Sequence, residues 1–363
     1  MSGDDSDQRF MREAIELARR VSFTSPNPRV GAVFVRDGLV IARGAHEGPG
    51  RPHAEAQALR GTDVSGSTLY VNLEPCVHRG RTPPCAPALV DAGVTRVVAA
   101  VEDPDERVSG RGLAALRDGG VDVVTGVLAA EATRLNAAYL HHRTTGRAFV
   151  SLKLAMTLDG RLGARDGSSR WITGPEARRR VHERRAEVDA VMVGSGTVSA
   201  DDPRLTARHP GATRQPARIV VDGSGTTSPS ARVLAGTGVT FVATTNRSSH
   251  DVHMGWKDAG AEVIVLPEAD DGVDLRALVE HLGAAGMLEV LCEGGARLAT
   301  SLLRADLVSR LELHLGPVLV GPGGAALGHL GVQSMGDARR WTRVSSEGCD
   351  GDTIVVLEPK TAH

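Results

Sequence analysis

The sequence predicts a two-domain protein of the α/β class, and three observations carry that prediction. The chain has 363 residues, which is more than a single hydrophobic core normally supports. In both halves, short apolar runs typical of buried strands alternate with amphipathic stretches typical of helices. A polar turn at Thr144-Thr145-Gly146 interrupts this alternation. We therefore expect one domain over residues 1–145 and another over residues 146–363.

The amino-acid composition indicates which classes of molecule the protein can bind. Hydrophobic residues make up 41% of the chain and charged residues 24%, as in an ordinary globular protein. The 42 basic and 44 acidic residues leave a net charge of −2, and aromatic residues are only 3%. The chain therefore has neither a broad basic field nor many aromatic platforms for nucleic acid. We expect a small-molecule substrate, no nucleic-acid partner and no membrane, and we leave a homo-oligomer open.

Cysteine usage and the apolar runs predict the compartment. No apolar leader opens the sequence, and no apolar run reaches the length of a membrane span. Of the four cysteines, Cys292 and Cys349 stand apart from the others in apolar or loop contexts. We expect no disulfides, a reducing compartment and a cytoplasmic location.

In the first half of the chain, expected strands alternate with expected helices. Residues 9–20 carry apolar side chains at helical spacing, and Asp37-Gly38 is a hairpin turn between two apolar runs. The same patterns continue up to the expected boundary. The expected helices are residues 9–20, 54–60, 86–92, 113–118 and 131–142, and the expected strands are 30–35, 39–42, 69–73, 96–101 and 121–124.

Three soft metal ligands and one acid lie beside these elements. His53 offers an imidazole nitrogen, while Cys76 and Cys85 offer thiolates, a zinc-binding set that leaves one position open for water. We interpret Glu55 as a proton shuttle, because zinc-dependent base deaminases pair an activated water with such a glutamate. Eight residues separate the cysteines, in place of the usual Cys-x-x-Cys spacing. Two core cysteines beside an unrelated histidine are the alternative.

Asn27 is the other polar candidate in the first half. It stands between Pro26 and Pro28, which hold it in an extended conformation just before the expected strand at 30–35. Its amide can donate to a heterocycle and accept from it at once, so we predict a substrate contact. A simple turn residue is the alternative.

Expected strands and helices alternate in the second half as well, and two glycine-rich turns follow strands there. The turns Gly194-Ser195-Gly196-Thr197 and Glu293-Gly294-Gly295-Ala296 each follow a strand, where backbone amides can approach a phosphate. Neither has the dinucleotide fingerprint with three spaced glycines, so by spacing alone each is more often a tight turn. The expected strands are residues 150–155, 190–193, 218–221, 240–243, 263–266 and 289–292, and the expected helices are 175–186, 274–285 and 297–303.

Over nearly the whole chain these motifs resemble the bifunctional deaminase/reductase family of riboflavin biosynthesis. The first half is similar in Pro26-Asn27-Pro28-Arg29-Val30-Gly31, in His53-Ala54-Glu55, and in the run from Glu74 to Cys85, whose most specific piece is Gly80-Arg81-Thr82-Pro83-Pro84-Cys85. The second half is similar in Leu152-Lys153-Leu154, Leu158-Asp159-Gly160-Arg161, Arg170-Trp171-Ile172-Thr173, Asp201-Asp202-Pro203 and Glu293-Gly294-Gly295. The resemblance implies a cytidine-deaminase-like three-layer domain followed by a dihydrofolate-reductase-like α/β domain.

The resemblance also implies two consecutive reactions and two cofactors, Zn2+ and NADPH. First, a diaminopyrimidine that carries a phosphoribosylamino group loses an amine to water. Then the opened ribose is reduced by NADPH to the ribityl chain.

The roles implied by the resemblance attach to particular residues. The zinc ligands would be His53, Cys76 and Cys85, with Glu55 as the proton shuttle. Cofactor contacts would be Ala155, Trp171, Thr197, Asp201, Gly294 and Gly295, although a tryptophan is more often a core residue. Substrate contacts would be Ser169, Arg185, Leu205, Arg208 and Glu293, where the two arginines suit a sugar phosphate.

Four further positions carry expectations. Lys153 is one of three lysines, and we predict that it contacts the reacting sugar; a surface lysine at a strand edge is the alternative. Arg247 is a candidate for the 2′-phosphate of NADP. Arg297 meets either phosphate or solvent. Asp105 stands where the family pattern leads us to expect an asparagine followed by proline, a departure that concerns the local loop and not the zinc chemistry.

Two other functions compete with this interpretation. One is a deaminase of free nucleosides or transfer RNA whose second domain binds without catalysing. The other is a zinc-stabilised interaction module, which predicts a fourth protein ligand and no need for Glu55. The low aromatic content and near-neutral charge argue against RNA.

Overall fold

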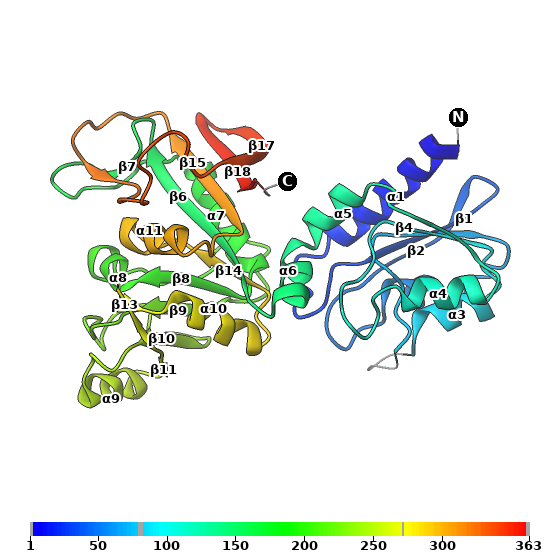
Figure 1. Ribbon diagram of the computed structural model, residues 1–363, viewed down its shortest axis with the longest axis horizontal. Coiled ribbons are helices and arrows are strands. Elements are labelled where there is room, and N and C mark those ends of the chain that lie inside the picture. Colours follow the sequence, from blue (N-terminus) through cyan, green and yellow to red (C-terminus); the bar gives the residue numbers. More distant parts are fainter. Residues whose placement is uncertain (1–2, 79–82, 271, 361–363) are drawn as a thin grey trace. The chain divides into compact units, whose positions relative to one another are not determined.

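The computed structural model describes residues 3–78, 83–270 and 272–360. The chain divides into two compact units, Met1–Gly146 and Arg147–His363, and each is built on a sheet of its own (Figure 1). No helix among the described residues is long and apolar enough to cross a membrane.

The first unit is a sheet with helices on both faces, so the three-layer prediction is confirmed. Its strand order is β2-β1-β3-β4-β5, in which β1 is antiparallel to β2 and β3, and β3 to β5 are parallel. Successive residues of β1 point to opposite faces of the sheet and belong to two different apolar cores. Val33 packs with α1, whereas Phe34 packs with α2, α3 and α4. The elements are α1 Gly3–Arg19, β1 Gly31–Arg36, β2 Leu39–Ala45, α2 Ala54–Ala58, β3 Thr68–Val71, α3 Cys85–Asp91, β4 Arg96–Ala99, α4 Arg111–Asp118, β5 Asp122–Thr125, α5 Ala129–Leu135 and α6 Ala137–Thr145.

The second unit is a larger mixed sheet with the order β11-β10-β9-β8-β14-β6-β15-β18-β17. Its strands are parallel from β11 to β15, and β18 and β17 are antiparallel. The core on one face includes Leu278 of α10 and Leu302 of α11, and the core on the other includes Val198 of α8 and Trp256 of α9. These two apolar faces make the strands buried on both sides, as parallel sheets require.

The elements of the second unit begin with the central strand β6. In order they are β6 Phe149–Thr157, β7 Arg161–Gly163, α7 Pro175–Glu187, β8 Ala190–Gly194, α8 Ser195–Asp201, β9 Ala217–Val221, β10 Thr240–Thr244, α9 His250–Asp258, β11 Glu262–Val265, β12 Glu268–Ala269, β13 Gly272–Val273, α10 Leu275–Ala284, β14 Glu289–Cys292, α11 Ala296–Arg304, β15 Arg310–Gly316, β16 Gly324–Ala325, β17 Trp341–Cys349 and β18 Asp352–Pro359.

Two glycines allow backbones to approach closely next to the candidate sites. A Cβ atom on Gly44 of β2 would lie 2.1 Å from the carbonyl oxygen of Ala54, the first residue of α2. A Cβ atom on Gly316 of β15 would lie 1.8 Å from the carbonyl oxygen of Ile172. Only glycine fits at either position, so each contact fixes a segment that carries candidate site residues.

The expected helix over residues 131–142 is wrong as a single element. The structure has α5 and α6 instead, with a break at Asn136. The Asn136 amide accepts from the Arg29 N–H at 2.8 Å and donates to the Arg29 carbonyl at 2.9 Å. Asn136 thus joins the break to the segment that precedes β1, a long-range contact that helical spacing does not reveal.

Candidate active sites

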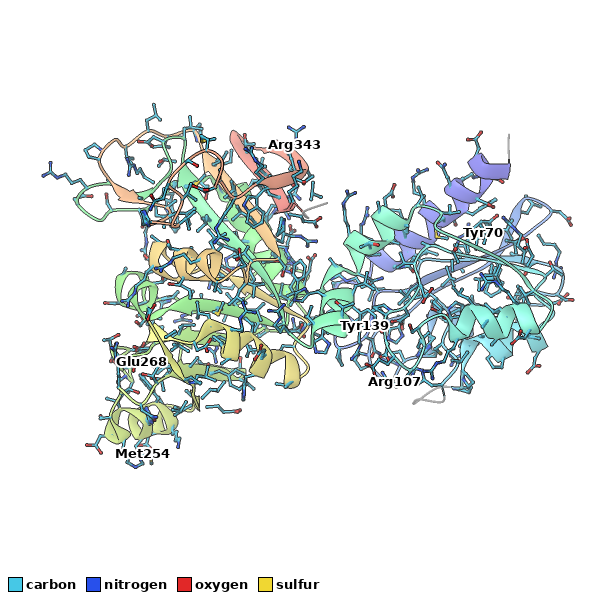
Figure 2. All side chains as sticks on the ribbon, viewed as in Figure 1. Tyr70, Arg107, Tyr139, Met254, Glu268 and Arg343 are labelled. Carbon is cyan, nitrogen blue, oxygen red and sulfur yellow. The ribbon has the colours of Figure 1, made fainter. Side chains whose placement is uncertain are left out.

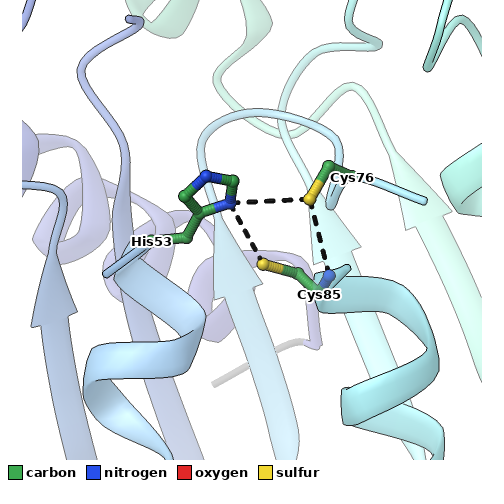
Figure 3. A group of neighbouring side chains, drawn as sticks. All are labelled: His53, Cys76 and Cys85. Atoms are coloured by element: carbon green, nitrogen blue, oxygen red, sulfur yellow. Dashed lines mark hydrogen bonds between the residues drawn. The ribbon is translucent and has the colours of Figure 1, made fainter. Parts of the chain in front are cut away.

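The three predicted metal ligands come together in the first unit, at the ends of different elements (Figure 3). His53 precedes α2, Cys76 follows β3, and Cys85 is the first residue of α3. The His53 Nδ1 atom lies 3.5 Å from the Cys76 sulfur and 3.3 Å from the Cys85 sulfur. One donor atom from each residue lies within 4.8 Å of the other two. Gly80, Arg81 and Thr82, part of the motif between the cysteines, lie outside the described residues.

The donor set fits zinc by its chemistry. Both thiols are buried, and each sulfur is close enough to the imidazole to share a small cation. Hydrogen bonds from Cys85 and His53 lower the pKa of Cys76 below its ordinary value, and the neighbouring Cys76 raises the pKa of Cys85. One imidazole nitrogen and two thiolates are ligands that zinc prefers, and three protein ligands leave a coordination position open.

Glu55 shares a cavity of about 120 Å³ with two of these ligands, His53 and Cys76. Its side chain is on α2, two residues beyond His53, and is only 3% exposed. Burial raises the pKa of Glu55 to about 7. The structure therefore places the Glu55 carboxyl beside the metal donors, at the wall of a cavity.

Asn27 lines the same cavity and its side-chain amide is oriented by a histidine. Asn27 Nδ2 lies 2.9 Å from Nε2 of His46, and Nδ1 of His46 lies 2.9 Å from the Pro52 carbonyl. The carbonyl oxygen can only accept, so Nδ1 of His46 is the protonated nitrogen and Nε2 accepts from Asn27. The Asn27 amide oxygen is thereby left for another partner. The sequence analysis missed His46, which directly follows β2, a strand that was expected to end at Ala42 but ends at Ala45.

Glu74 is a second residue that the sequence analysis did not single out for a role of its own. Its carboxylate is 4% exposed and accepts four backbone N–H groups. The donors are Asp103 at 3.1 Å, Gly110 at 3.0 Å, Gly112 at 2.7 Å and Leu113 at 3.2 Å. The loop from β4 to α4, which forms one wall of the cavity, is therefore folded around this carboxylate. Its sequence signals are its place directly after an apolar run and its place at the start of the run from Glu74 to Cys85 that resembles the family.

The same loop shows what the unexpected Asp105 does. The Asp105 carboxylate accepts from Arg107 at 2.7 Å and lies 3.4 Å from Arg143 of α6. The Arg107 side chain lowers the pKa of Asp105 well below its ordinary value. Asp103 accepts from the hydroxyl of Tyr139 at 3.0 Å. Figure 2 labels both Tyr139 and Arg107 in the first unit. Asp105 thus forms ion pairs with Arg107 and Arg143, where an asparagine would offer only a neutral amide.

In the second unit, the predicted cofactor and substrate residues line one cavity of about 1280 Å³. It lies where β6, β14, β8 and β9 end, the edge at which parallel sheets usually bind ligands. The predicted cofactor residues on its wall are Ala155, Trp171, Thr197, Asp201, Gly294 and Gly295, and the predicted substrate residues are Lys153, Ser169, Arg185, Leu205, Arg208 and Glu293.

A charged cluster forms the inner wall of this cavity. The Arg185 guanidinium donates to both carboxylate oxygens of Glu293, at 2.7 and 2.8 Å, and to the Thr206 carbonyl at 3.0 Å. Lys153 is on β6, between β14 and β15, so the strand-edge alternative is wrong. Burial lowers the pKa of Lys153, and the nearby Glu293 opposes that effect. The guanidinium of Arg185 is therefore engaged in an ion pair with Glu293.

Trp171 and the two glycine turns form the outer wall. Trp171 is 66% exposed, so it is not a core residue, and the Arg178 guanidinium carbon lies 4.2 Å from its ring centre. The Gly295 N–H donates to the Thr197 hydroxyl at 2.9 Å, which joins one glycine turn to the other. A Cβ atom on Gly294 would lie 2.8 Å from the Leu298 side chain. The turns therefore form one continuous backbone surface along the cavity.

Arg247 does not belong to this wall. Its side chain is 58% exposed and pairs with Glu268 at 2.6 Å, and it is absent from the described residues that line the cavity. The segment after β10 thus does not bring this arginine to the cavity, because the cavity lies over β9 and the strands beyond it. Arg297 does line the cavity, at the start of α11.

Buried charges lie on the sheet beside the cavity. Arg184 of α7 pairs with Glu289 and with Glu312, the latter at 3.2 Å. Glu312 is the register partner of Lys153, and His314 is the partner of Ala155. His314 is 4% exposed, and burial lowers its pKa to about 3. His314 is therefore a neutral side chain near the charged groups of Lys153, Glu293 and Arg180.

Two family models match the chain. Residues 148–355 match the model described as RibD C-terminal domain. Residues 4–101 match the model described as cytidine and deoxycytidylate deaminase zinc-binding region. The two matches fall on different units of the chain.

Curated relatives and solved structures are similar over nearly the whole length. The riboflavin biosynthesis protein RibD of Escherichia coli (strain K12) is 41% identical over 348 residues, which are 92% of this chain and 94% of that protein. The RibD protein of Aquifex aeolicus (strain VF5) is 37% identical over 355 residues, 97% of this chain and 98% of that protein. A structure of Acinetobacter baumannii RibD is 35% identical with a TM-score of 0.88, covering 99% of this chain and 100% of that one.

Proposed function

The chain belongs to the RibD family of bifunctional deaminase/reductases in riboflavin biosynthesis, and on that premise we propose how its residues divide the two reactions. We assign zinc-dependent deamination to residues 1–145 and NADPH-dependent reduction to residues 146–363. The observation that carries the proposal is the convergence of His53, Cys76 and Cys85 beside the buried Glu55 in one cavity.

In the first unit, His53, Cys76 and Cys85 would hold the zinc. Zinc, when bound, supplies the Lewis acidity that activates water at neutral pH. The Glu55 carboxylate takes a proton from the attacking water and passes it to the departing amine, which leaves as ammonia. Asn27, oriented by His46, holds the pyrimidine through its amide oxygen.

In the second unit, Ala155, Trp171, Thr197, Asp201 and the Gly294-Gly295 turn would hold NADPH, which supplies the hydride. The ribosyl chain would be held by Lys153, Ser169, Leu205, Arg208 and the Arg185–Glu293 pair. These residues are supported as a set by their common cavity, which is large enough for a dinucleotide beside a second ligand. The protein's share of the reduction is to position the two reactants.

We further propose that the substrate is the phosphoribosylaminopyrimidine whose diaminopyrimidine ring the first unit deaminates and whose ribosyl group the second unit reduces. We also propose a cytoplasmic location without nucleic-acid or membrane partners, which the near-neutral charge and low aromatic content support.

The test is the mass of the product formed by the zinc-loaded protein from that substrate, with and without NADPH. We expect deamination alone without NADPH and a reduced ribityl product with it. Glu55→Gln should retain zinc and lose about a hundredfold or more in deamination, because general acid-base catalysis contributes that much. Glu16→Gln, a surface glutamate paired with Arg19, is the matched control and should change neither activity.

Each negative result of this test would change a different part of the proposed function. Full deamination by Glu55→Gln would remove the shuttle role. Deamination without reduction would leave the second unit with another task.

A further inference from the structure

Trp171 lies on the wall of the large cavity with most of its side chain outside the core. It is 66% exposed, whereas Trp256 is fully buried and Trp341 is partly buried. The proposed function gives Trp171 a contact with NADPH, yet a side chain this exposed has several rotamers open to it. If NADPH binds only one of them, binding free energy is lost in fixing the ring, unless another group fixes it first.

A guanidinium group lies against this indole. The Cζ atom of Arg178, in the first turn of α7, lies 4.2 Å from the centre of the Trp171 ring, and the Cζ atom of Arg170 lies 5.8 Å from it. A guanidinium within about 6 Å of an aromatic ring centre is attracted to the ring, and more strongly where water is excluded. Arg178 is the nearer of the two and is partly buried, whereas Arg170 is exposed. Arg178 therefore makes the stronger contact.

The same guanidinium is fixed by the backbone. Nη1 of Arg178 donates to the carbonyl of Thr173 at 2.5 Å. Arg179, the next residue of α7, instead pairs with Glu176 of the same helix. A planar guanidinium can stack on an aromatic ring and donate hydrogen bonds at once. The two contacts of Arg178 therefore join the Trp171 indole to the backbone two residues further along the chain.

The backbone that accepts from Arg178 is itself anchored to the sheet. The Gly174 N–H donates at 2.7 Å to the carboxylate of Asp352, a buried residue of β18. The Ile172 carbonyl lies against Gly316 of β15, at a position where a Cβ atom would not fit. The segment that follows the tryptophan is therefore held by two strands, and the arginine extends that support to the exposed indole.

Two roles are open to Arg178, because it lines the large cavity together with Trp171. It can hold the indole, or it can bind an anionic part of NADPH directly. The contacts favour the first role, since the guanidinium lies against the ring and one of its N–H groups is engaged by Thr173. A guanidinium engaged in this way has fewer donors left for the parallel hydrogen bonds that bind a phosphate.

We propose that Arg178 is a positioning residue of the reductase: its guanidinium holds the Trp171 indole in the orientation that NADPH binds, without touching the cofactor. The inference rests on the proposed function, in which Trp171 contacts NADPH, and adds a residue that acts only through Trp171. It predicts that the loss of Arg178 matters only while the indole is present.

The test is a double-mutant cycle in the full-length protein, with Arg178→Met, Trp171→Leu and the two substitutions together. Methionine keeps an unbranched side chain and removes the charge. Calorimetric titration measures Kd for NADPH, and steady-state reduction gives KM for NADPH and kcat. Arg180→Met is the matched control, because it removes the same charge from an exposed arginine of α7 that is outside the described lining of the cavity.

A second measurement reports on the indole without any cofactor. The anisotropy of tryptophan emission decays partly through motion of the ring on the picosecond-to-nanosecond timescale. The share that belongs to Trp171 is the difference between each protein and the same protein with Trp171→Leu. We expect Arg178→Met to enlarge this fast component and Arg180→Met to leave it unchanged, because only the first removes the contact with the ring.

We expect Arg178→Met to raise Kd and KM for NADPH by roughly two- to fivefold, the range that a partly exposed cation–π contact allows. The kcat at saturating NADPH and the rate of deamination should be unchanged. Trp171→Leu should weaken NADPH binding at least as much, and Arg178→Met should add nothing in that background.

Three results would overturn the proposal. One is NADPH affinity that is unchanged in either single variant. Another is an anisotropy decay that Arg178→Met does not alter. The third is an effect of Arg178→Met that persists in full without the indole, which would assign the arginine to direct contact with the cofactor.

The proposed function fails by a different result. Wild-type protein that binds NADPH with the expected coupling between Arg178 and Trp171, but reduces no deaminated substrate, would support the positioning role and refute the reductase assignment. Normal reduction with independent effects of the two substitutions would do the reverse.

Discussion

At the scale of single residues, Glu74 is the side chain on which the wall of the first cavity depends. We expect Glu74→Gln to lower the free energy of unfolding of the first unit by about 3 kcal/mol, because an amide nitrogen would face backbone N–H donors in a buried place. Deamination should fall while reduction persists. Urea unfolding and the two activities measure this.

The control for Glu74 is Glu13→Gln. Glu13 pairs with Arg43 at the surface of the same unit, so its loss should cost less than about 1 kcal/mol. Equal effects of the two substitutions would show that the four hydrogen bonds to Glu74 contribute little.

His314 makes a prediction about pH. Burial holds the pKa of His314 at about 3, below its ordinary 6.5, with Lys153, Glu293 and Arg180 as its charged neighbours. As pH falls below about 6.5 the unfolded chain takes up the proton first, so stability present above that pH is lost toward pH 3, at up to about 1.4 kcal/mol per pH unit.

The measurement is the urea midpoint of the second unit between pH 7 and about 5, above the range where most carboxylates titrate. We expect a shallower pH dependence in His314→Gln than in the wild-type protein. Parallel curves would contradict the prediction.

Residues whose role depends on local spacing could be predicted from the sequence. His53, Glu55, Cys76 and Cys85 form a motif, and the structure brings them together. Glu74 escaped this reasoning, because its role is to accept N–H groups from a loop almost thirty residues or more away in the chain. Such a partner is set by tertiary structure and leaves no local pattern.

At the scale of elements, two close backbone contacts predict separable damage. We expect Gly44→Ala to push α2 away from β2, displace His53 and Glu55, and reduce zinc content and deamination. Gly316→Ala should displace the segment of Ile172 from β15 and raise KM for NADPH through Trp171.

Each glycine variant is the control for the other. Bound zinc, deamination and reduction should be measured in both proteins. Loss of both activities in either variant would mean that the contact supports the whole chain and not one site.

The elements that could be predicted are those with a clear apolar pattern. The strands that became β1, β4, β8 and β14 were expected within a few residues. The strands β17 and β18 were missed, because β17 is largely exposed and shows no alternation of apolar and polar residues. Strand β18 joins the sheet by pairing with β15, and β17 joins it by pairing with β18; sequence periodicity cannot reveal either pairing.

At the scale of the whole molecule, the separate cores predict two thermal transitions. Each unit is built around apolar clusters of its own, Phe34 and Val33 belonging to those of the first and Leu278 and Trp256 to those of the second. Removal of zinc with a chelator should lower one transition, and NADPH should raise the other, because a ligand stabilises the unit that binds it. Differential scanning calorimetry checks both shifts. A single transition moved by both ligands would contradict the expectation.

The scarcity of lysine has a practical consequence for handling the protein. Only Lys153, Lys257 and Lys360 carry side-chain amines, and the last two are exposed in the second unit, away from the described lining of either cavity. Amine-directed coupling at alkaline pH would therefore reach two accessible lysines. A support or fluorophore attached through those two lysines would leave both cavities open, so immobilised protein should still admit substrate to each.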